Sequence, residues 1–162
     1  MSKREAAISI VVNNKPDVLA RIAGTFSGRG FNIESISANV TRDPAITKII
    51  ITTIGTQDTI TKIEKQINRL VDVLVARDIS VDEAVQREML LIRMKPAAAD
   101  RNDLYKAVIT NGWKIIGQDD TYLFIEVTGE REDIDRALAV LEPLGMEDFS
   151  RTGTVVIERR GP

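Results

Sequence analysis

The run from Asn14 to Ser35 constrains the fold of this chain more than any other part of it. Asn14 and Pro16 are residue types that end a strand and begin a helix. The apolar residues that follow recur at the spacing of one helix face, at Val18, Leu19, Ile22, Ala23 and Phe26. Two glycines then close the helix before another strand begins, at Gly28 and Gly30 followed by Asn32-Ile33. The run therefore predicts a strand–turn–helix–turn–strand unit.

The N-terminus of this predicted helix leads out of a strand-to-helix turn. Backbone N–H groups in the first turn of a helix lack acceptors within the helix, so they can hold a small anion such as a carboxylate. The residues alone leave two interpretations open. One is an anion-binding site, and the other is an ordinary unit of strand, helix and strand that binds no ligand.

The N-terminal half continues this alternation of elements. Period-two and β-branched patterns predict strands at residues 7–12, 32–40, 46–54 and 73–79. The first helix spans residues 17–27. The second begins after a cap at Thr56 and carries one apolar face, formed by Ile60, Ile63, Ile67, Leu70 and Val71. The resulting order is β-α-β-β-α-β, which is typical of ferredoxin-like domains.

The C-terminal half repeats that order. We predict strands at residues 88–94, 113–117, 122–127 and 154–158, the last of which closes the second sheet. Asp100 is expected to cap one helix, and Asn111-Gly112 to end it. The second helix carries Ile134, Ala137, Leu138 and Leu141. The predicted fold class is α+β, with two ferredoxin-like βαββαβ domains at residues 5–80 and 86–161 and a linker near residues 80–86.

The predicted strand at residues 46–54 carries apolar side chains on both faces, Ile49 and Ile51 on one and Ile50 and Ile54 on the other. Helices cover only one face of a sheet in a two-layer domain. The other face must therefore be covered by the second domain or by another copy of the chain. A stand-alone monomer is not expected.

Composition excludes several kinds of chemistry. The 162 residues include no histidine and no cysteine, which excludes Ser–His and Cys–His nucleophiles, Cys/His zinc sites and disulfides. The net charge of −2 provides no basic field for nucleic acid or an anionic membrane. No apolar run reaches the length of a membrane span, and the charged N-terminus lacks the apolar region of a signal peptide. We therefore expect a cytoplasmic protein.

Three further patterns are weak signals. The glycines at Gly24, Gly28 and Gly30 lack the Gly-Lys-Ser/Thr ending of a phosphate-binding loop. The acidic side chains of Asp119-Asp120 and residues 130–135 suit solvated surfaces better than a metal site. The two central strands of the first predicted sheet lack the aromatic rings on which RNA bases stack. We expect neither a metal nor a nucleic acid as a ligand.

Three segments of the chain combine into a recognisable pattern. They are the run from Asn14 to Ser35, the segment from Val85 to Ile92, and Arg151-Thr152-Gly153-Thr154 with Arg159 and Gly161 near the end. Together they resemble the small, regulatory subunit of acetolactate synthase (acetohydroxyacid synthase). This resemblance implies an N-terminal ACT domain and a C-terminal ACT-like domain.

The resemblance also implies a function without catalysis by this chain. Members of that family bind a separate catalytic subunit, which uses thiamine diphosphate, Mg²⁺ and FAD to condense pyruvate with a second 2-oxo acid. The small subunit activates that enzyme and confers feedback inhibition by valine or another branched-chain amino acid. By resemblance, this chain would form a homodimer through its ACT domains and would hold no cofactor itself.

The family places valine between two ACT domains. Carried over residue by residue, the resemblance assigns Asn14 and the backbone of Asp17 and Val18 from one chain, and Asn32 and Ile33 from its partner. The two asparagines would offer amide hydrogen bonds, while Val18 and Ile33 would contact the effector side chain. Two of these assignments have an ordinary structural alternative, Asn14 as a turn residue and Ile33 as part of the core.

Asp17 departs from the family pattern, which has glycine at this position. A second carboxylate beside the effector would weaken its binding, unless Asp17 turns outward and stabilises its own helix terminus. Two other functions remain alternatives at this point. One is a stand-alone ACT-domain amino-acid sensor for another enzyme, and the other is a small ferredoxin-like enzyme that uses Asp or Lys residues as acid and base.

Overall fold

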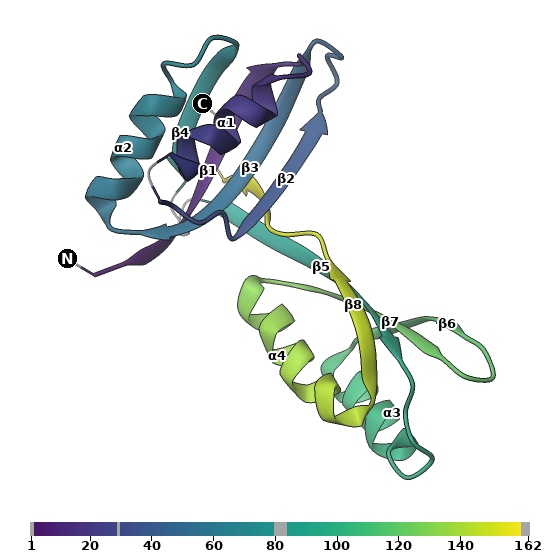
Figure 1. Ribbon diagram of the computed structural model, residues 1–162. Helices are drawn as coiled ribbons and strands as arrows, with labels where there is room; N and C mark the ends of the chain where they lie inside the picture. The colour runs from purple at the N-terminus through teal and green to yellow at the C-terminus, as the bar shows by residue number, and fades with distance from the viewer. Residues whose placement is uncertain (1, 29, 80–83, 160–162) are drawn as a thin grey trace. The chain divides into compact units, whose positions relative to one another are not determined.

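The computed structural model describes residues 2–28, 30–79 and 84–159, and the chain divides into two compact units (Figure 1). Unit 1 runs from the N-terminus to Gln86 and resumes at Thr154, while unit 2 runs from Arg87 to Gly153. Of the linker expected near residues 80–86, residues 80–83 lie outside the described ranges, as do Arg29 and Gly161 of the family pattern. Ala84 already begins a strand.

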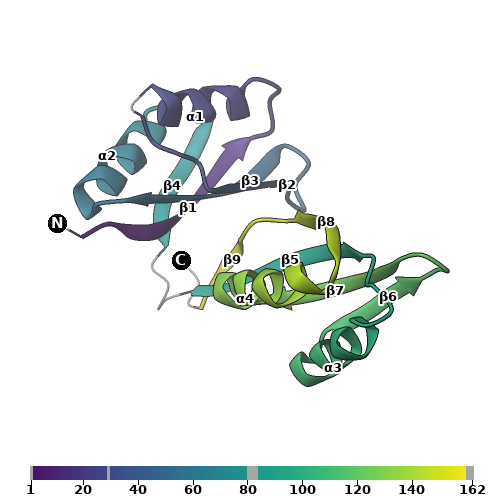
Figure 2. The same cartoon turned by 60° about the horizontal axis from the view of Figure 1, so that its bottom comes forward.

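Unit 1 has the predicted order of elements. They are β1 (Arg4–Asn13), α1 (Val18–Ser27), β2 (Ser35–Val40), β3 (Ile46–Gly55), α2 (Gln57–Ile67) and β4 (Val73–Ile79). The sheet order is β2-β3-β1-β4 and every pair is antiparallel. Figure 2 shows both helices on one face of this sheet. The prediction of a βαββαβ unit is confirmed for the N-terminal half.

Alternation along the strands of unit 1 builds its main core. Ile8 and Ile10 of β1 and Ile49 and Ile51 of β3 point to the helices and are almost completely buried. They pack against the apolar faces of the helices, which include Ile22, Phe26, Ile63 and Ile67. Thr56 caps α2 as predicted, because its hydroxyl accepts a hydrogen bond from the Thr59 amide at 3.3 Å.

The other face of this sheet has a small core of its own. Ala7, Ile50 and Ile79 are buried there against Ala84 and Val156. Val156 lies in β9 (Val155–Glu158), which pairs with β5 (Ala84–Met94). The chain thus covers this face with its own C-terminal strand, within unit 1. The strand predicted at residues 154–158 is therefore present and pairs with β5, in the second sheet, but it is not the strand that completes that sheet.

Unit 2 also has the βαββαβ order. Its elements are β5, α3 (Arg101–Asn111), β6 (Lys114–Gln118), β7 (Leu123–Gly129), α4 (Arg131–Leu141), a short 3₁₀ turn η2 (Glu142–Leu144) and β8 (Met146–Arg151). The sheet order is β6-β7-β5-β8. The strand that closes it is β8, which the sequence did not predict, because only Met146 and Phe149 of this edge strand are apolar. The two ferredoxin-like units of the predicted α+β fold are nevertheless both present.

One core holds unit 2 together. Leu90, Ile92 and Met94 of β5 alternate inward and meet the apolar faces of both helices, which include Leu104 and Ile134. Helix α3 ends as predicted at Gly112, whose φ of 68° is left-handed, but the Asp100 side chain makes no cap hydrogen bond. Among the residues that the structure describes, no helix is long and apolar enough to cross a membrane.

Candidate functional site

The turn between β1 and α1 is tied to the loop that precedes β3. The Asn14 amide donates to the Ala45 carbonyl at 2.7 Å, and the Asn14 side-chain nitrogen donates to the Pro44 carbonyl at 3.0 Å. Asn14 is thus engaged in a turn, as its structural alternative anticipated. One of the two N–H donors of its side-chain nitrogen is used within the chain, which leaves the other N–H and the Oδ1 atom of this exposed residue available to a ligand.

Free backbone donors lie in the first turn of α1. The Val18 amide donates to the Lys15 carbonyl at 3.3 Å, and the Arg21 amide donates to the Asp17 carbonyl at 3.1 Å. The amides of Leu19 and Ala20 have no acceptor among the described residues. The amides without an acceptor therefore lie just beyond the Asp17–Val18 backbone, to which the resemblance assigned the effector carboxylate. Val18 itself is buried, in the main core of unit 1.

Asp17 precedes α1 but does not cap it. Its side chain makes no hydrogen bond to the helix amides and pairs instead with the Arg21 guanidinium, one turn later on the same helix. The hydrogen bond from Arg21 lowers the pKa of the Asp17 carboxyl. The carboxylate is therefore paired and turned away from its own helix terminus. The sequence-based alternative in which Asp17 turns outward agrees with this arrangement in direction, but the carboxylate pairs with Arg21 and makes no hydrogen bond that caps the helix.

Asp72, between α2 and β4, anchors the same turn from the other side. Its Oδ1 atom lies 2.6 Å from Lys15 Nζ and accepts a hydrogen bond from the Asn13 side chain at 3.1 Å. The Asp72 carbonyl also accepts the Asn13 amide at 2.8 Å. The hydrogen bonds from Lys15 and Asn13 lower the pKa of this carboxyl, whose side chain is 6% exposed. Its φ of 75° is positive, which is uncommon for a residue other than glycine.

Asn32 and Ile33 lie just before β2. Asn32 is exposed, and its carbonyl accepts a hydrogen bond from the Thr53 hydroxyl at 2.7 Å. Ile33 is half-buried and packs on the main core of unit 1. Within the described part of the chain, neither residue is hydrogen-bonded to the first turn of α1. The resemblance assigned them to the partner's half of the site, and they remain predictions.

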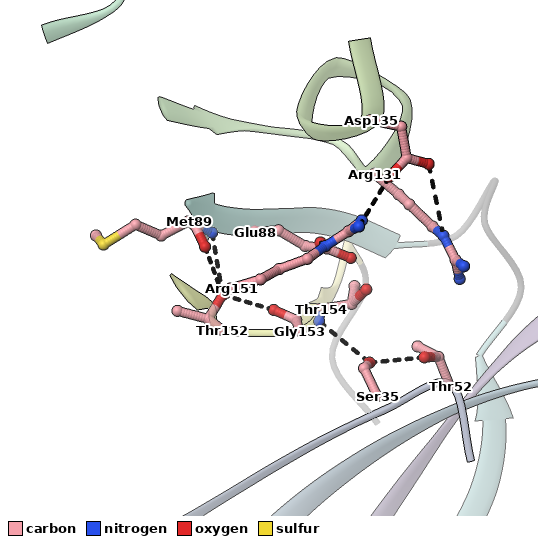
Figure 3. A network of polar contacts seen from close by, with 10 residues as sticks. All are labelled: Ser35, Thr52, Glu88, Met89, Arg131, Asp135, Arg151, Thr152, Gly153 and Thr154. Atoms are coloured by element: carbon pink, nitrogen blue, oxygen red, sulfur yellow. Dashed lines mark hydrogen bonds and ion pairs between the residues drawn. The ribbon is translucent and has the colours of Figure 1, made fainter. Parts of the chain in front are cut away.

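The two later segments of the family pattern meet in unit 2 (Figure 3). Arg151 Nε donates to the buried Glu88 carboxylate at 2.5 Å, and Arg151 Nη1 donates to Asp135 at 2.8 Å. Burial opposes the charge of Arg151, but the two carboxylates outweigh it and raise the pKa of the guanidinium. Thr152 also contacts β5, because its hydroxyl accepts a hydrogen bond from the Met89 amide at 3.0 Å.

The next residues of this segment belong to unit 1. The Thr154 amide lies 3.4 Å from the Ser35 hydroxyl, which is 2.6 Å from the Thr52 hydroxyl (Figure 3). Ser35 is the last residue of the first family segment. Sequence positions that carry the resemblance thus make direct contacts that hold strands together. In the described ranges, no group of three or more His, Cys, Asp or Glu side chains could hold a metal ion.

Comparisons with known proteins point to one family in both halves of the chain. Residues 8–75 match a family model described as an AHAS small subunit-like ACT domain, and residues 87–160 match one described as the small subunit of acetolactate synthase. A probable acetolactate synthase small subunit of Methanothermobacter thermautotrophicus is 34% identical over 153 residues, which cover 94% of this chain and 91% of the relative. The acetolactate synthase small subunit of Aquifex aeolicus is 35% identical over 158 residues, which cover 96% of this chain and 82% of the relative.

A solved structure has the same arrangement of elements. The crystal structure of the acetolactate synthase small subunit from Thermotoga maritima has a TM-score of 0.87 and 33% sequence identity, and covers 98% of this chain and 99% of that one. Fold and sequence together define an ACT-domain protein with a second ferredoxin-like unit. The chain belongs to the family of acetolactate synthase small subunits.

Proposed function

We propose that this chain is the non-catalytic regulatory subunit that activates a thiamine diphosphate-dependent acetolactate synthase. In this proposal the catalytic subunit holds thiamine diphosphate, Mg²⁺ and FAD, and the two subunits work together in the cytoplasm. The observation that carries the proposal is the pair of family matches, which follow one another along residues 8–75 and 87–160. The absence of histidine and cysteine from the sequence is consistent with it.

The second part of the proposal is feedback inhibition by valine or a related branched-chain amino acid. The free amides of Leu19 and Ala20 would receive the effector carboxylate. Asn14 and Val18 would complete one half of the site, beside the Asp17 backbone. Asn32 and Ile33 would come from a second copy of the chain.

Pairing of two copies through residues 7–79 is the third part. The strand β2 lies at one end of its sheet, and Ile36 and Val40 on it are 41% and 55% exposed. An edge strand with exposed apolar residues favours pairing with another strand. The second sheet face supports this dimer less than the sequence suggested, because Ala84 and Val156 cover its centre.

One mixing experiment tests activation and inhibition in sequence. The purified chain is added to the catalytic subunit of its own organism with pyruvate, and acetolactate formation is followed, with and without valine. We expect a rise in rate on mixing, a fall on adding valine, and no acetolactate from this chain alone. No rise and no co-purification would overturn activation and favour a free ACT-domain sensor, whereas turnover by the chain alone would favour a small enzyme. Sedimentation as an 18.0 kDa monomer at micromolar concentration would overturn the dimer.

A further inference from the structure

Four charged side chains meet where the chain enters α1. Lys15 contacts Asp72 at 2.6 Å, Arg21 pairs with Asp17, and Arg21 Nη1 also lies 3.8 Å from Asp72 Oδ2. The two positive and two negative charges cancel. An exposed aspartate next to a helix N-terminus is thereby built into a neutral group, directly beside the two free amides of the first turn.

Without Arg21, Asp17 would hinder an anion in two ways. An aspartate at this position ordinarily bonds to the amides of its own first turn, so it would occupy the donors that a ligand needs. Its negative charge would also repel a second carboxylate a few ångströms away. In the structure Asp17 has helical backbone angles (φ −96°, ψ −5°), its side chain makes no cap hydrogen bond, and its carboxylate bonds to Arg21, which compensates the charge.

We propose that Arg21 is a positioning residue of the effector site, which holds Asp17 away from the α1 amides and neutralises it, so that an amino-acid carboxylate can bind there. Asp72 supports Arg21 from behind and fixes Lys15 and Asn13, so the turn keeps its shape. The inference rests on the proposed effector function. It assigns no contact between Arg21 and the effector itself.

Calorimetric titration of the full chain with L-valine, L-leucine and L-isoleucine tests this role. The chains compared are the unchanged one, Arg21→Gln, Asp17→Asn and the double variant. We expect Arg21→Gln to raise Kd for the tightest-binding amino acid about tenfold, because the Asp17 charge is released at the site. Asp17→Asn alone should change Kd less than about twofold. The double variant should return to within about twofold of the unchanged chain.

That rescue separates positioning from a merely structural role. If Arg21 served only the stability of α1, the double variant would bind as weakly as Arg21→Gln. A matched control is Lys62→Gln, since Lys62 and Asp58 form an ion pair of the same spacing in α2, and Kd should not change. Arg21→Lys should retain most of the affinity.

Two results would overturn the inference in different ways. If the unchanged chain binds valine but Arg21→Gln binds equally well, or if Asp17→Asn fails to rescue it, the role of Arg21 is refuted and the effector site stands. If the unchanged chain binds none of the three amino acids, the effector site and the role of Arg21 fall together. Activation of the catalytic subunit would still be judged by the mixing experiment.

Discussion

The two units share one order of elements but bury their sheets differently. In unit 1 the sheet has a core on each face, because Ala84 and Val156 close over Ile50 on the face without helices. In unit 2 the buried apolar clusters of the described residues lie on the helix side only, and Leu91, the neighbour of the buried Leu90 and Ile92, is 42% exposed. Two units with the same topology can therefore differ in whether one face or both faces of the sheet are buried.

The difference comes from the strand β9, whose residues belong to unit 1. After β8 has completed the sheet of unit 2, the chain continues through Thr154 into β9 and contributes to unit 1. Covering a strand that is apolar on both faces stabilises it by roughly 25 cal/mol for each Å² of apolar surface removed from water. The centre of that face is covered by Ala84 and Val156 of the same chain, and Val156 lies within residues 86–161, which the sequence assigned to the second domain.

A charge placed in the second core of unit 1 should lower the stability of the chain more than any other change considered below. We expect Val156→Asp to destabilise the chain by on the order of 4 kcal/mol, because Val156 is 7% exposed and the new carboxylate would be buried without a partner. Urea unfolding followed by far-UV circular dichroism measures this loss. Val155→Asp is the matched control, since Val155, the neighbour of Val156 in β9, is 47% exposed and should tolerate the change. Equal losses in both variants would show that β9 does not cover the sheet.

Truncating apolar side chains at comparable places compares the two sheets directly. Ile50→Ala should cost about 3 kcal/mol, as expected for a buried isoleucine that leaves a cavity. Leu91→Ala should cost less than about 1 kcal/mol, because that side chain is already in contact with solvent. The single tryptophan, Trp113, packs on the core of unit 2. Its fluorescence therefore follows unit 2, and far-UV circular dichroism follows both units. A larger loss for Leu91→Ala than for Ile50→Ala would reverse the comparison.

Local patterns in the sequence predicted most of the fold. The strand β3, both helices of unit 1 and the Thr56 cap follow from periodicity and from residue types close together in the chain. The sequence could not show that Val156 of β9 packs against Ile50, because that contact joins residues far apart in the sequence. The strand β8 escaped prediction because it alternates too few apolar residues.

The candidate site likewise contains some contacts that local sequence signals predict and others that they do not. The pairing of Asp17 with Arg21 follows from a spacing of four residues on a helix, and this signal was present in the sequence. The contact of Lys15 with Asp72 joins distant segments and left no local signal. The sequence also could not show that the Val18 amide is used by Lys15, since that depends on the conformation of the turn.

Unit 2 contains an ion pair between Arg151 and the buried carboxylate of Glu88. Arg151→Met should destabilise the chain by about 2 kcal/mol, because the Glu88 carboxylate, 3% exposed, loses its guanidinium partner. Adding Glu88→Gln to that variant should recover part of the loss, since the remaining buried group is then neutral. Arg87→Met is the control, because the Arg87–Glu130 pair is exposed and worth less than about 1 kcal/mol. Trp113 fluorescence during unfolding should record the loss, and an unchanged midpoint would refute it.

The smallest expected difference lies at the starts of the corresponding helices α2 and α4. In unit 1 the Thr56 hydroxyl accepts the Thr59 amide at 3.3 Å, while in unit 2 the Asp133 side chain returns to accept the Glu130 amide at 3.0 Å. Thr56→Ala removes the acceptor and should cost about 1 kcal/mol. Thr56→Ser retains a hydroxyl and should cost little. The loss should appear in far-UV circular dichroism before it appears in Trp113 fluorescence, since the cap lies in unit 1. If both signals shift equally, the two units unfold as one cooperative body, and their separate cores do not make them separate in stability.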